Sequence, residues 1–405
     1  MRPTPTLFKQ NIGWHFRKLW HIKGNRKVLD IGSEKILKKQ GIATEDPNEF
    51  IKDFVVTKPE RVEIVGIRGP RKTTIDNWHE RPLLTYGHAN VLLQGLTQAK
   101  VLTNTVEVVQ GLPENYSIED ISRQVNKRVK DVILASCVLD AEQKLLPHIK
   151  DRNRPAYVFP RAYGITQQRV FKLLISRLLH LIETTSAPEL VRQRHLADNL
   201  LFSYPFERNG DLIQFQQLGD LVMLAEKPLA PITRQSLNEF QLPDLFPVSP
   251  TVTLQPTNKY VLRNVYPVNK TSRKYHPHTL FINYNKETVK NLFEEEVTQE
   301  QICGRTLLKA FTAAAAYAKE QFGDEVKDLP TPVTLQAIQT DGREFYFGVL
   351  QLNTLDLSST ETRNIWYQSP VLRLFEKCAY ELGRPVLHDY NRAVVNHILA
   401  FYNRN

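Results

Sequence analysis

The stretch QTDGREFYFGVLQLNTLDL, residues 339–357, brings together side chains that could do chemistry. Asp341 and Arg343 flank a glycine, and three aromatic residues follow, so a carboxylate, a guanidinium and an apolar wall would be neighbours. The same residues also predict a β-hairpin, because Asp341-Gly342 is a two-residue turn signal between alternating apolar runs. Both faces of this hairpin, residues 333–352, are apolar. We therefore expect it inside a sheet covered on two sides, a packing role that assigns no chemistry to Asp341 or Arg343.

Two glycine-containing stretches resemble ligand-binding motifs but do not complete them. RKVLDIGSEKIL, residues 26–37, contains a VLDIG similar to the first motif of methyltransferases that bind S-adenosylmethionine, but charged side chains follow Gly32 where that motif needs glycines. GIRGPRKTT, residues 66–74, is similar to a phosphate-binding loop, but Arg71 replaces the glycine before the lysine and Pro70 lacks an amide donor. We expect no nucleotide site here, and an RNA-modifying methyltransferase stays open as the alternative function.

Histidines and cysteines do not form a recognisable catalytic or metal motif. The sequence contains neither GxSxG nor HExxH, and His276 and His278 flank a proline with no identified partner ligands. The three cysteines, Cys137, Cys303 and Cys378, are far apart and form no CxxC pair. We expect buried thiols in a reducing compartment. Catalytic, cofactor-binding and metal-binding residues are therefore not predicted.

Positive charge is the chain's main chemical feature. The 405 residues carry a net charge of +10, which favours polyanion partners over a merely soluble basic surface only when the cations cluster. Residues 1–27 contain seven basic residues, no acid and several aromatic side chains. This composition is typical of a mitochondrial targeting segment, and it also suits an arm that neutralises RNA phosphates. The candidate phosphate contacts are Arg17, Lys18, Lys23, Arg26, Lys27, Lys35, Lys38, Lys39, Arg68, Arg71, Lys72, Arg123, Lys127 and Lys130.

Hydrophobic periodicity places these residues on elements. It predicts helices over residues 167–183 and 301–322, a strand over 214–224, and a helical region after Ser117, which has the capping-box spacing with Asp120. Arg123, Lys127 and Lys130 would share one face of that helical region. His180 would lie on the polar edge of the first helix in a structural role. No apolar run approaches the roughly 20 residues of a membrane span.

The predicted fold class is α+β, with mixed helices packed on a largely antiparallel sheet and an extended basic N-terminal segment. We expect three parts. Residues 1–60 form the basic N-terminal segment, residues 61–245 a helix-rich N-terminal lobe, and residues 246–405 an α+β C-terminal lobe with the hairpin. A proline-rich stretch before and after residue 245 suggests the boundary between the lobes.

Several short segments together resemble one family. They are GLPE (residues 111–114), FPVSPTVTL (246–254), HPHTLF (276–281) and the span from LLKAF to QLNTLDL (307–357). Their order and spacing resemble the animal mitochondrial large ribosomal subunit proteins numbered thirty-seven, over roughly residues 80–405. A paralogous mitoribosomal protein, formerly called small-subunit protein thirty, shares the TDG…QLNT hairpin, but PVSP and HPHTLF favour the first family.

The resemblance implies a structural constituent of the mitochondrial ribosome large subunit, located in the mitochondrial matrix and supporting translation. It implies contacts with large-subunit rRNA and with neighbouring ribosomal proteins, including the paralogue. It carries over no catalytic residue, so no enzyme is expected. The first sixty residues show no clear match, and the proposed role of that segment comes from its composition alone.

Overall fold

The computed structural model describes residues 31–45, 49, 77–109, 111–148, 154, 156–233, 241–268, 274–293 and 295–405. The chain divides into two compact units, residues 1–73 and 74–405, which are described separately. In the first unit the structure describes one short helix, α2 (Ser33–Lys39), in which no residue is buried. Most of the predicted basic N-terminal segment lies outside the described residues.

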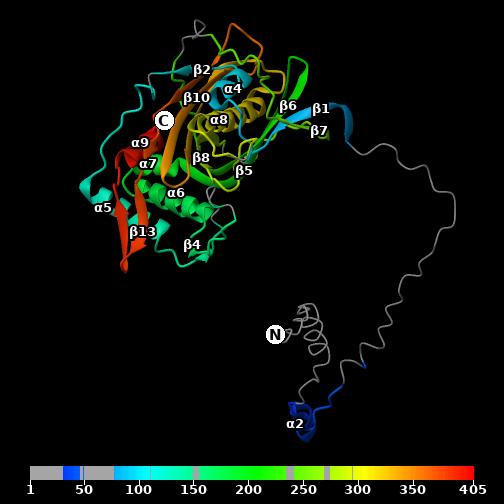
Figure 1. Ribbon diagram of the computed structural model, residues 1–405, viewed down its shortest axis with the longest axis vertical. Helices are drawn as coiled ribbons and strands as arrows, with labels where there is room; N and C mark the ends of the chain where they lie inside the picture. Colours follow the sequence, from blue (N-terminus) through cyan, green and yellow to red (C-terminus); the bar gives the residue numbers. More distant parts are fainter. Residues whose placement is uncertain are drawn as a thin grey trace, which may run out of the picture. The chain divides into compact units, whose positions relative to one another are not determined.

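A ten-stranded mixed sheet organises the second unit (Figure 1). The strand order is β2-β11-β10-β9-β8-β6-β1-β7, with β12 beside β10 and β5 beside β6. Six of its nine strand pairings are antiparallel, which confirms the predicted α+β fold. The strands are β1 (Trp78–Tyr86), β2 (Thr105–Val108), β5 (Arg194–Arg208), β6 (Asp211–Ala225), β7 (Gln255–Lys259), β8 (His276–Asn283), β9 (Asp328–Thr340), β10 (Glu344–Thr354), β11 (Asn364–Gln368) and β12 (Leu372–Arg373).

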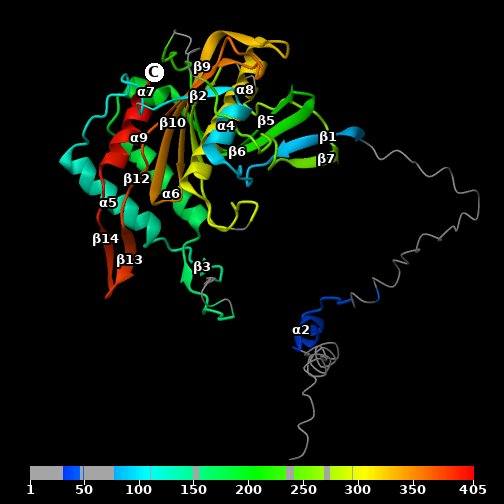
Figure 2. The same cartoon turned by 45° about the horizontal axis from the view of Figure 1, so that its top comes forward.

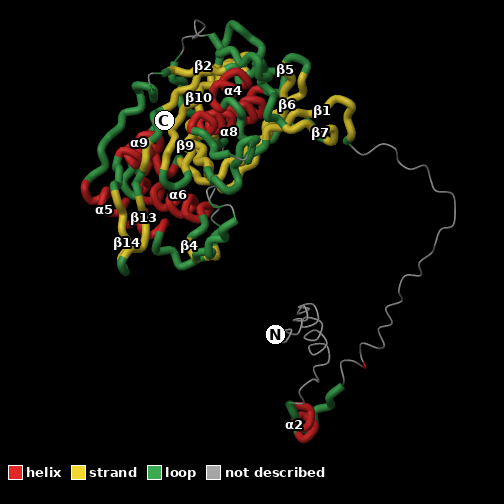
Figure 3. Tube along the Cα trace, viewed as in Figure 1, coloured by secondary structure: helices red, strands yellow, loops and turns green. Residues whose placement is uncertain are grey.

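Helices cover both faces of this sheet (Figures 1 and 2). Helices α4 (Gly95–Leu102) and α8 (Gln299–Phe322) enclose one apolar core, and α5 (Arg123–Cys137), α6 (Gln167–Glu183) and α9 (Ala393–Asn403) enclose the other. The tube in Figure 3 shows these helices in red and the sheet between them in yellow. Helix α7 (Pro188–Arg192) and two small ribbons, β3 (Lys144–Leu145) with β4 (Tyr163–Gly164) and β13 (Lys377–Glu381) with β14 (Arg384–His388), complete the described elements.

The sheet takes strands from both sides of residue 245. Strand β8, from the predicted C-terminal lobe, lies between β6 of the predicted N-terminal lobe and β9. The predicted division of the chain into parts that end at residues 60 and 245 therefore stays a prediction.

The central hairpin has the two buried faces that its alternation predicts. Val333, Leu335 and Ala337 lie in the core beneath α8, whereas Phe345 and Phe347 lie in the opposite core. Successive side chains of a strand point to opposite faces of the sheet, so one apolar hairpin contributes residues to both cores.

The predicted two-residue turn is wrong. Thr340 pairs with Phe345, which leaves residues 341–344 between the paired positions. The Asp341 carboxylate accepts hydrogen bonds from the backbone N–H of Arg343 and of Glu344, each 2.8 Å long. Gly342 has a φ of 96°, which favours glycine. The side chain of Asp341 thus builds a longer turn than the dipeptide signal predicts.

Helix α8 confirms the predicted helix and crosses the core nearly completely buried. It begins with a full capping box, in which Thr298 accepts from the Gln301 backbone and the Gln301 side chain accepts from the Thr298 backbone. A Cβ added at Gly304 would lie 2.4 Å from the backbone of Gly95 on α4. The backbones of α8 and α4 therefore pack closely at Gly304, where a side chain would not fit.

Helix α5 begins later than predicted. Its N-cap is Ser122, whose hydroxyl accepts from the backbone N–H of Val125 at 3.3 Å, and not Ser117. Asp120, the expected partner of Ser117, instead accepts from the Asn396 side chain at 2.6 Å and pairs with Arg392 at 3.1 Å. These contacts with the C-terminal region hold the preceding residues outside the helix.

Candidate nucleic-acid interface

The exposed surface of α5 carries a cluster of cations. Val129 and Ile133 bury the inner face of the helix completely. Arg123, Lys127, Arg128 and Lys130 are exposed on the rest, and Asp131 is the only acid of the helix. Within the described residues, Arg123, Lys127 and Arg128 have no ion pair. We name these four cations the α5 basic face.

Three contacts hold α5 in its orientation. The Tyr390 hydroxyl donates to Asn126 Oδ1 at 2.8 Å, and the Lys130 ammonium lies 5.4 Å from the centre of the Tyr390 ring. Arg177 on α6 donates to the Ser136 hydroxyl at 3.3 Å. The helix is thereby held to the body of the protein, and its cations point to solvent without needing to reorganise for a ligand.

Several other surface cations are paired with neighbouring carboxylates. Arg81 pairs with Glu207, Lys172 with Asp198, and Lys144 with Glu142, each at 2.8 Å. Lys377 and Arg373 are also paired with glutamates. The α5 basic face differs from these paired cations because it gathers several cations without carboxylate partners on one helix. Arg123 also stands at the first helical position, where a cation opposes the helix dipole and costs about 0.3–1 kcal/mol.

The structure separates the predicted phosphate contacts into three groups. Arg123, Lys127 and Lys130 share one side of α5, and Arg128, which the sequence argument missed, is exposed on a flank of the same helix. Its position beside Lys127 in a helix with one acid was the available signal. Lys35, Lys38 and Lys39 lie on α2 in the other unit, where Lys38 pairs with Glu34 at 2.6 Å. Outside the described residues lie Arg17, Lys18, Lys23, Arg26, Lys27, Arg68, Arg71 and Lys72.

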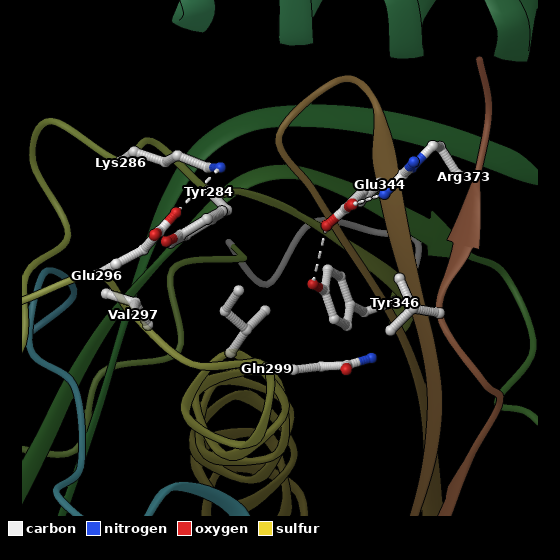
Figure 4. A pocket seen from close by; sticks show the side chains of 10 residues that line it. Tyr284, Lys286, Glu296, Val297, Gln299, Glu344, Tyr346 and Arg373 are labelled. Atoms are coloured by element: carbon white, nitrogen blue, oxygen red, sulfur yellow. Dashed lines mark hydrogen bonds and ion pairs between the residues drawn. The ribbon is translucent and has the colours of Figure 1, made fainter. Parts of the chain in front are cut away.

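A polar pocket of about 590 Å³ opens at the N-terminal end of α8 (Figure 4). Its charged groups are paired, since Lys286 lies 3.9 Å from Glu296 and Arg373 lies 3.0 Å from Glu344. The Tyr346 hydroxyl donates to Glu344 at 3.4 Å. Burial raises the pKa of Tyr284 to about 12, so its phenol stays protonated at neutral pH. The arrangement offers hydrogen bonds and aromatic walls for binding, with no activated nucleophile among these side chains.

Two cations that the sequence argument did not single out are buried within α8. Lys309 is 2% exposed, donates to the Leu218 carbonyl at 2.7 Å and lies 3.9 Å from Asp220. Arg305 donates to Gln339 at 2.7 Å and to the carbonyls of His88 and Asn283. Burial lowers the pKa of both groups. They tie the helix to the sheet and are not available to a ligand.

The two histidines around Pro277 have structural partners. His278 is 1% exposed and bonds the Arg404 carbonyl and the Thr279 hydroxyl, each at 2.8 Å. Burial lowers the pKa of His278 to about 3. His276 bonds the Tyr317 hydroxyl. Among the described residues, no group of three or more histidine, cysteine, aspartate or glutamate side chains could hold a metal ion. No described helix is long and apolar enough to cross a membrane.

Comparison with known proteins shows similarity first in the C-terminal part of the chain and then over most of it. A family model described as mitochondrial 28S ribosomal protein S30 (PDCD9) matches residues 267–405, which include α8 and the central hairpin. The C-terminal part of the chain is therefore similar to a family of mitochondrial ribosomal proteins.

Relatives named large ribosomal subunit protein mL37 match over a longer part of the chain. The Gallus gallus protein is 28% identical over 337 residues, which are 79% of this chain and 72% of the relative. The Rattus norvegicus protein is 29% identical over 308 residues, 73% and 67% of the two chains. The Bos taurus protein is 30% identical over 292 residues, 69% and 64%. The predicted resemblance is confirmed, because mitochondrial large-subunit ribosomal proteins named mL37 are similar to this chain over most of its length.

Proposed function

We propose that this chain is a structural constituent of the large subunit of the mitochondrial ribosome, in the mitochondrial matrix. It binds rRNA and neighbouring ribosomal proteins in support of mitochondrial translation and catalyses no reaction. The observation that carries this proposal is the similarity to mL37 proteins over most of the chain. The motif that suggested a methyltransferase gains no support from the described part of its sequence, where α2 follows Gly32 directly.

The α5 basic face is the proposed rRNA contact within the second unit. Its cations are exposed and lack carboxylate partners among the described residues. Each cation that meets a phosphate releases condensed counterions, which favours binding without reading the base sequence. The basic residues of the N-terminal segment are proposed as further phosphate contacts on the basis of composition alone.

Sedimentation of a mitochondrial lysate through a sucrose gradient tests the ribosomal role. The chain should peak with the large subunit, and it should move to lighter fractions when the subunit is taken apart. Absence from the large-subunit peak would show that the similarity to mL37 proteins does not extend to this function.

Ribonuclease treatment separates the two proposed kinds of partner. Contacts made through the α5 basic face should be lost with the RNA, while contacts with neighbouring ribosomal proteins, including the paralogue, should survive. An association that is wholly insensitive to ribonuclease would contradict the rRNA part of the proposal and leave a protein-only scaffold.

A further inference from the structure

The pocket beside the start of α8 is lined by oxygen acceptors that the proposed rRNA contact does not use. Its volume of about 590 Å³ lies within the range of ligand sites, about 300–1,000 Å³. Tyr284 and Glu296 line one side, and Tyr346 and Glu344 line the other, over the end of α8 (Figure 4). The pocket therefore offers two phenol oxygens and two carboxylates to a single occupant.

Two parallel strands and the helix that connects them position this pocket. Strands β8 and β9 are parallel neighbours, and α8 lies between them in the sequence. Tyr284 directly follows β8, Gln299 is the first residue of α8, and both line the pocket. In open α/β sheets, ligands bind at the carboxyl ends of parallel strands. The pocket thus occupies a position that is typical of ligand sites.

The Tyr284 hydroxyl is a polar group without a partner among the described residues. Tyr284 is 3% exposed, its backbone N–H donates to the Thr340 carbonyl, and its backbone carbonyl accepts from Gln167. Its hydroxyl bonds no other residue in the described part of the chain. A buried phenol usually has a hydrogen-bond partner. Because Tyr284 lines the pocket, an occupant of the pocket can be that partner.

The surrounding charge favours a cation as the occupant. Both cations of the lining already lie against carboxylates, Arg373 at 3.0 Å from Glu344 and Lys286 at 3.9 Å from Glu296. Burial, and then the charge of nearby carboxylates, raises the pKa of Tyr284 to about 12. A cation that enters the pocket meets these carboxylates as acceptors, whereas a phosphate would be repelled by them.

The loop between β8 and α8 adds to this negative charge. Residues 286–300 contain five glutamates and two lysines, in a chain whose net charge is +10. Glu296 is exposed on this loop, and so are the apolar side chains of Leu292 and Phe293. A basic segment of another protein complements an acidic surface of this kind, and the two apolar side chains add contact area.

We propose that this pocket binds an arginine side chain from a basic segment of a neighbouring protein. The guanidinium donates to the carboxylates of Glu296 and Glu344 and to the Tyr284 hydroxyl. Its planar fork carries five donors and can reach acceptors on both sides of the pocket, whereas a lysine ammonium has only three. The proposal deepens the contacts with ribosomal proteins proposed above and rests on that function for the identity of its partner.

Peptide binding to the purified full-length chain tests the pocket. The probe is a fluorescein-labelled peptide, GSRGSRGSRG, and two comparison peptides replace each arginine by lysine or by citrulline, which has a similar shape but no charge. Fluorescence polarisation should show binding of the arginine peptide, weaker binding of the lysine peptide and no binding of the citrulline peptide. Equal binding of either comparison peptide, or no binding of the arginine peptide, would overturn the proposal. The chain would then still sediment with the large subunit, so this failure is distinguishable from failure of the ribosomal role.

Three variants locate the binding site. Tyr284→Phe removes only the hydroxyl and should weaken binding of the arginine peptide roughly three- to tenfold. Glu296→Gln changes an exposed side chain that the fold tolerates and should weaken binding about tenfold or more. Glu287→Gln is the matched control, because Glu287 is exposed on the same loop but does not line the pocket, and it should leave the affinity nearly unchanged. If Glu287→Gln and Glu296→Gln weaken binding equally, the charge of the loop and not the pocket holds the peptide, and the proposal fails.

Discussion

Neutralising the α5 basic face gives the sharpest test of the proposed rRNA contact. The variant replaces Arg123, Lys127, Arg128 and Lys130 by glutamine. These side chains are exposed, so the fold should tolerate the change, and losing a cation at the first helical position should stabilise α5 by about 0.3–1 kcal/mol. The loss of the Lys130–Tyr390 contact offsets this by about 0.5–1 kcal/mol. Thermal unfolding should therefore change little.

RNA binding should change strongly and in a salt-dependent way. Each phosphate contact contributes about 0.7–0.9 to the slope of log K against log salt, so four lost contacts should reduce the slope by about 3. For the unmodified chain, a slope contribution of 3 lowers the affinity for RNA about 60-fold between 50 and 200 mM salt. The variant should not show this part of the salt dependence. Fluorescence polarisation with a labelled fragment of large-subunit rRNA, repeated over a salt series, measures both quantities.

A matched control separates position from total charge. Arg81, Lys144 and Lys377 are exposed and Lys172 is half-buried, and each of the four is paired with a carboxylate. Replacing these four by glutamine changes the net charge equally and should leave the slope nearly unaltered. If both variants lower the slope by the same amount, general charge and not the α5 basic face governs binding. If neither does, α5 does not contact RNA.

Three further predictions concern the fold. Asp341→Ala should lower the free energy of unfolding by about 1–2 kcal/mol, because two backbone N–H groups lose their acceptor. The variant should still sediment with the large subunit. If a stably folded variant no longer associates, Asp341 has a functional role. Gly304→Ala should lower the free energy of unfolding in urea by about 3 kcal/mol, because the new Cβ would meet the backbone of Gly95. Gly87→Ala is the control: its Cβ would meet only side-chain atoms, the nearest at 3.7 Å, so the loss should be well under half of that. The pKa of His278 is lowered to about 3 in the folded chain, so as the pH falls the histidine takes up a proton in the unfolded state before it does so in the folded state. The folded state is therefore stabilised above pH 6.5, and this stability is lost as the pH falls. Between pH 6.5 and 5 the loss should be about 2 kcal/mol, and an equally steep loss in His278→Gln would assign it to other groups.

Local sequence patterns were sufficient for the elements that carry their own periodicity. The alternating apolar residues of the hairpin predicted two buried faces because side chains in a strand alternate between faces. The spacing in residues 167–183 and 301–322 predicted α6 and α8 within two residues, because a helix repeats its buried face every three to four residues. The three cations on α5 could be placed on one surface for the same reason.

Tertiary contacts decided what local patterns cannot encode. Ser117 and Ser122 both have a capping side chain, and the contacts of Asp120 with Arg392 and Asn396 decided between them. Likewise, Lys309 on α8 can be buried because its ammonium donates a hydrogen bond to the Leu218 carbonyl of the sheet. The residues near Lys309 in the sequence do not indicate this partner.

By itself, the sequence determined the central hairpin, the main helices, the excess of positive charge and the family resemblance. Each of these depends only on neighbouring or regularly spaced residues. The order of the strands in the sheet was decided only in three dimensions. Strand β8 lies between β6 and β9 because the burial of two apolar faces, and not proximity along the chain, selects its neighbours. The same packing brings β13 against α5, although the two elements are more than 200 residues apart in the sequence.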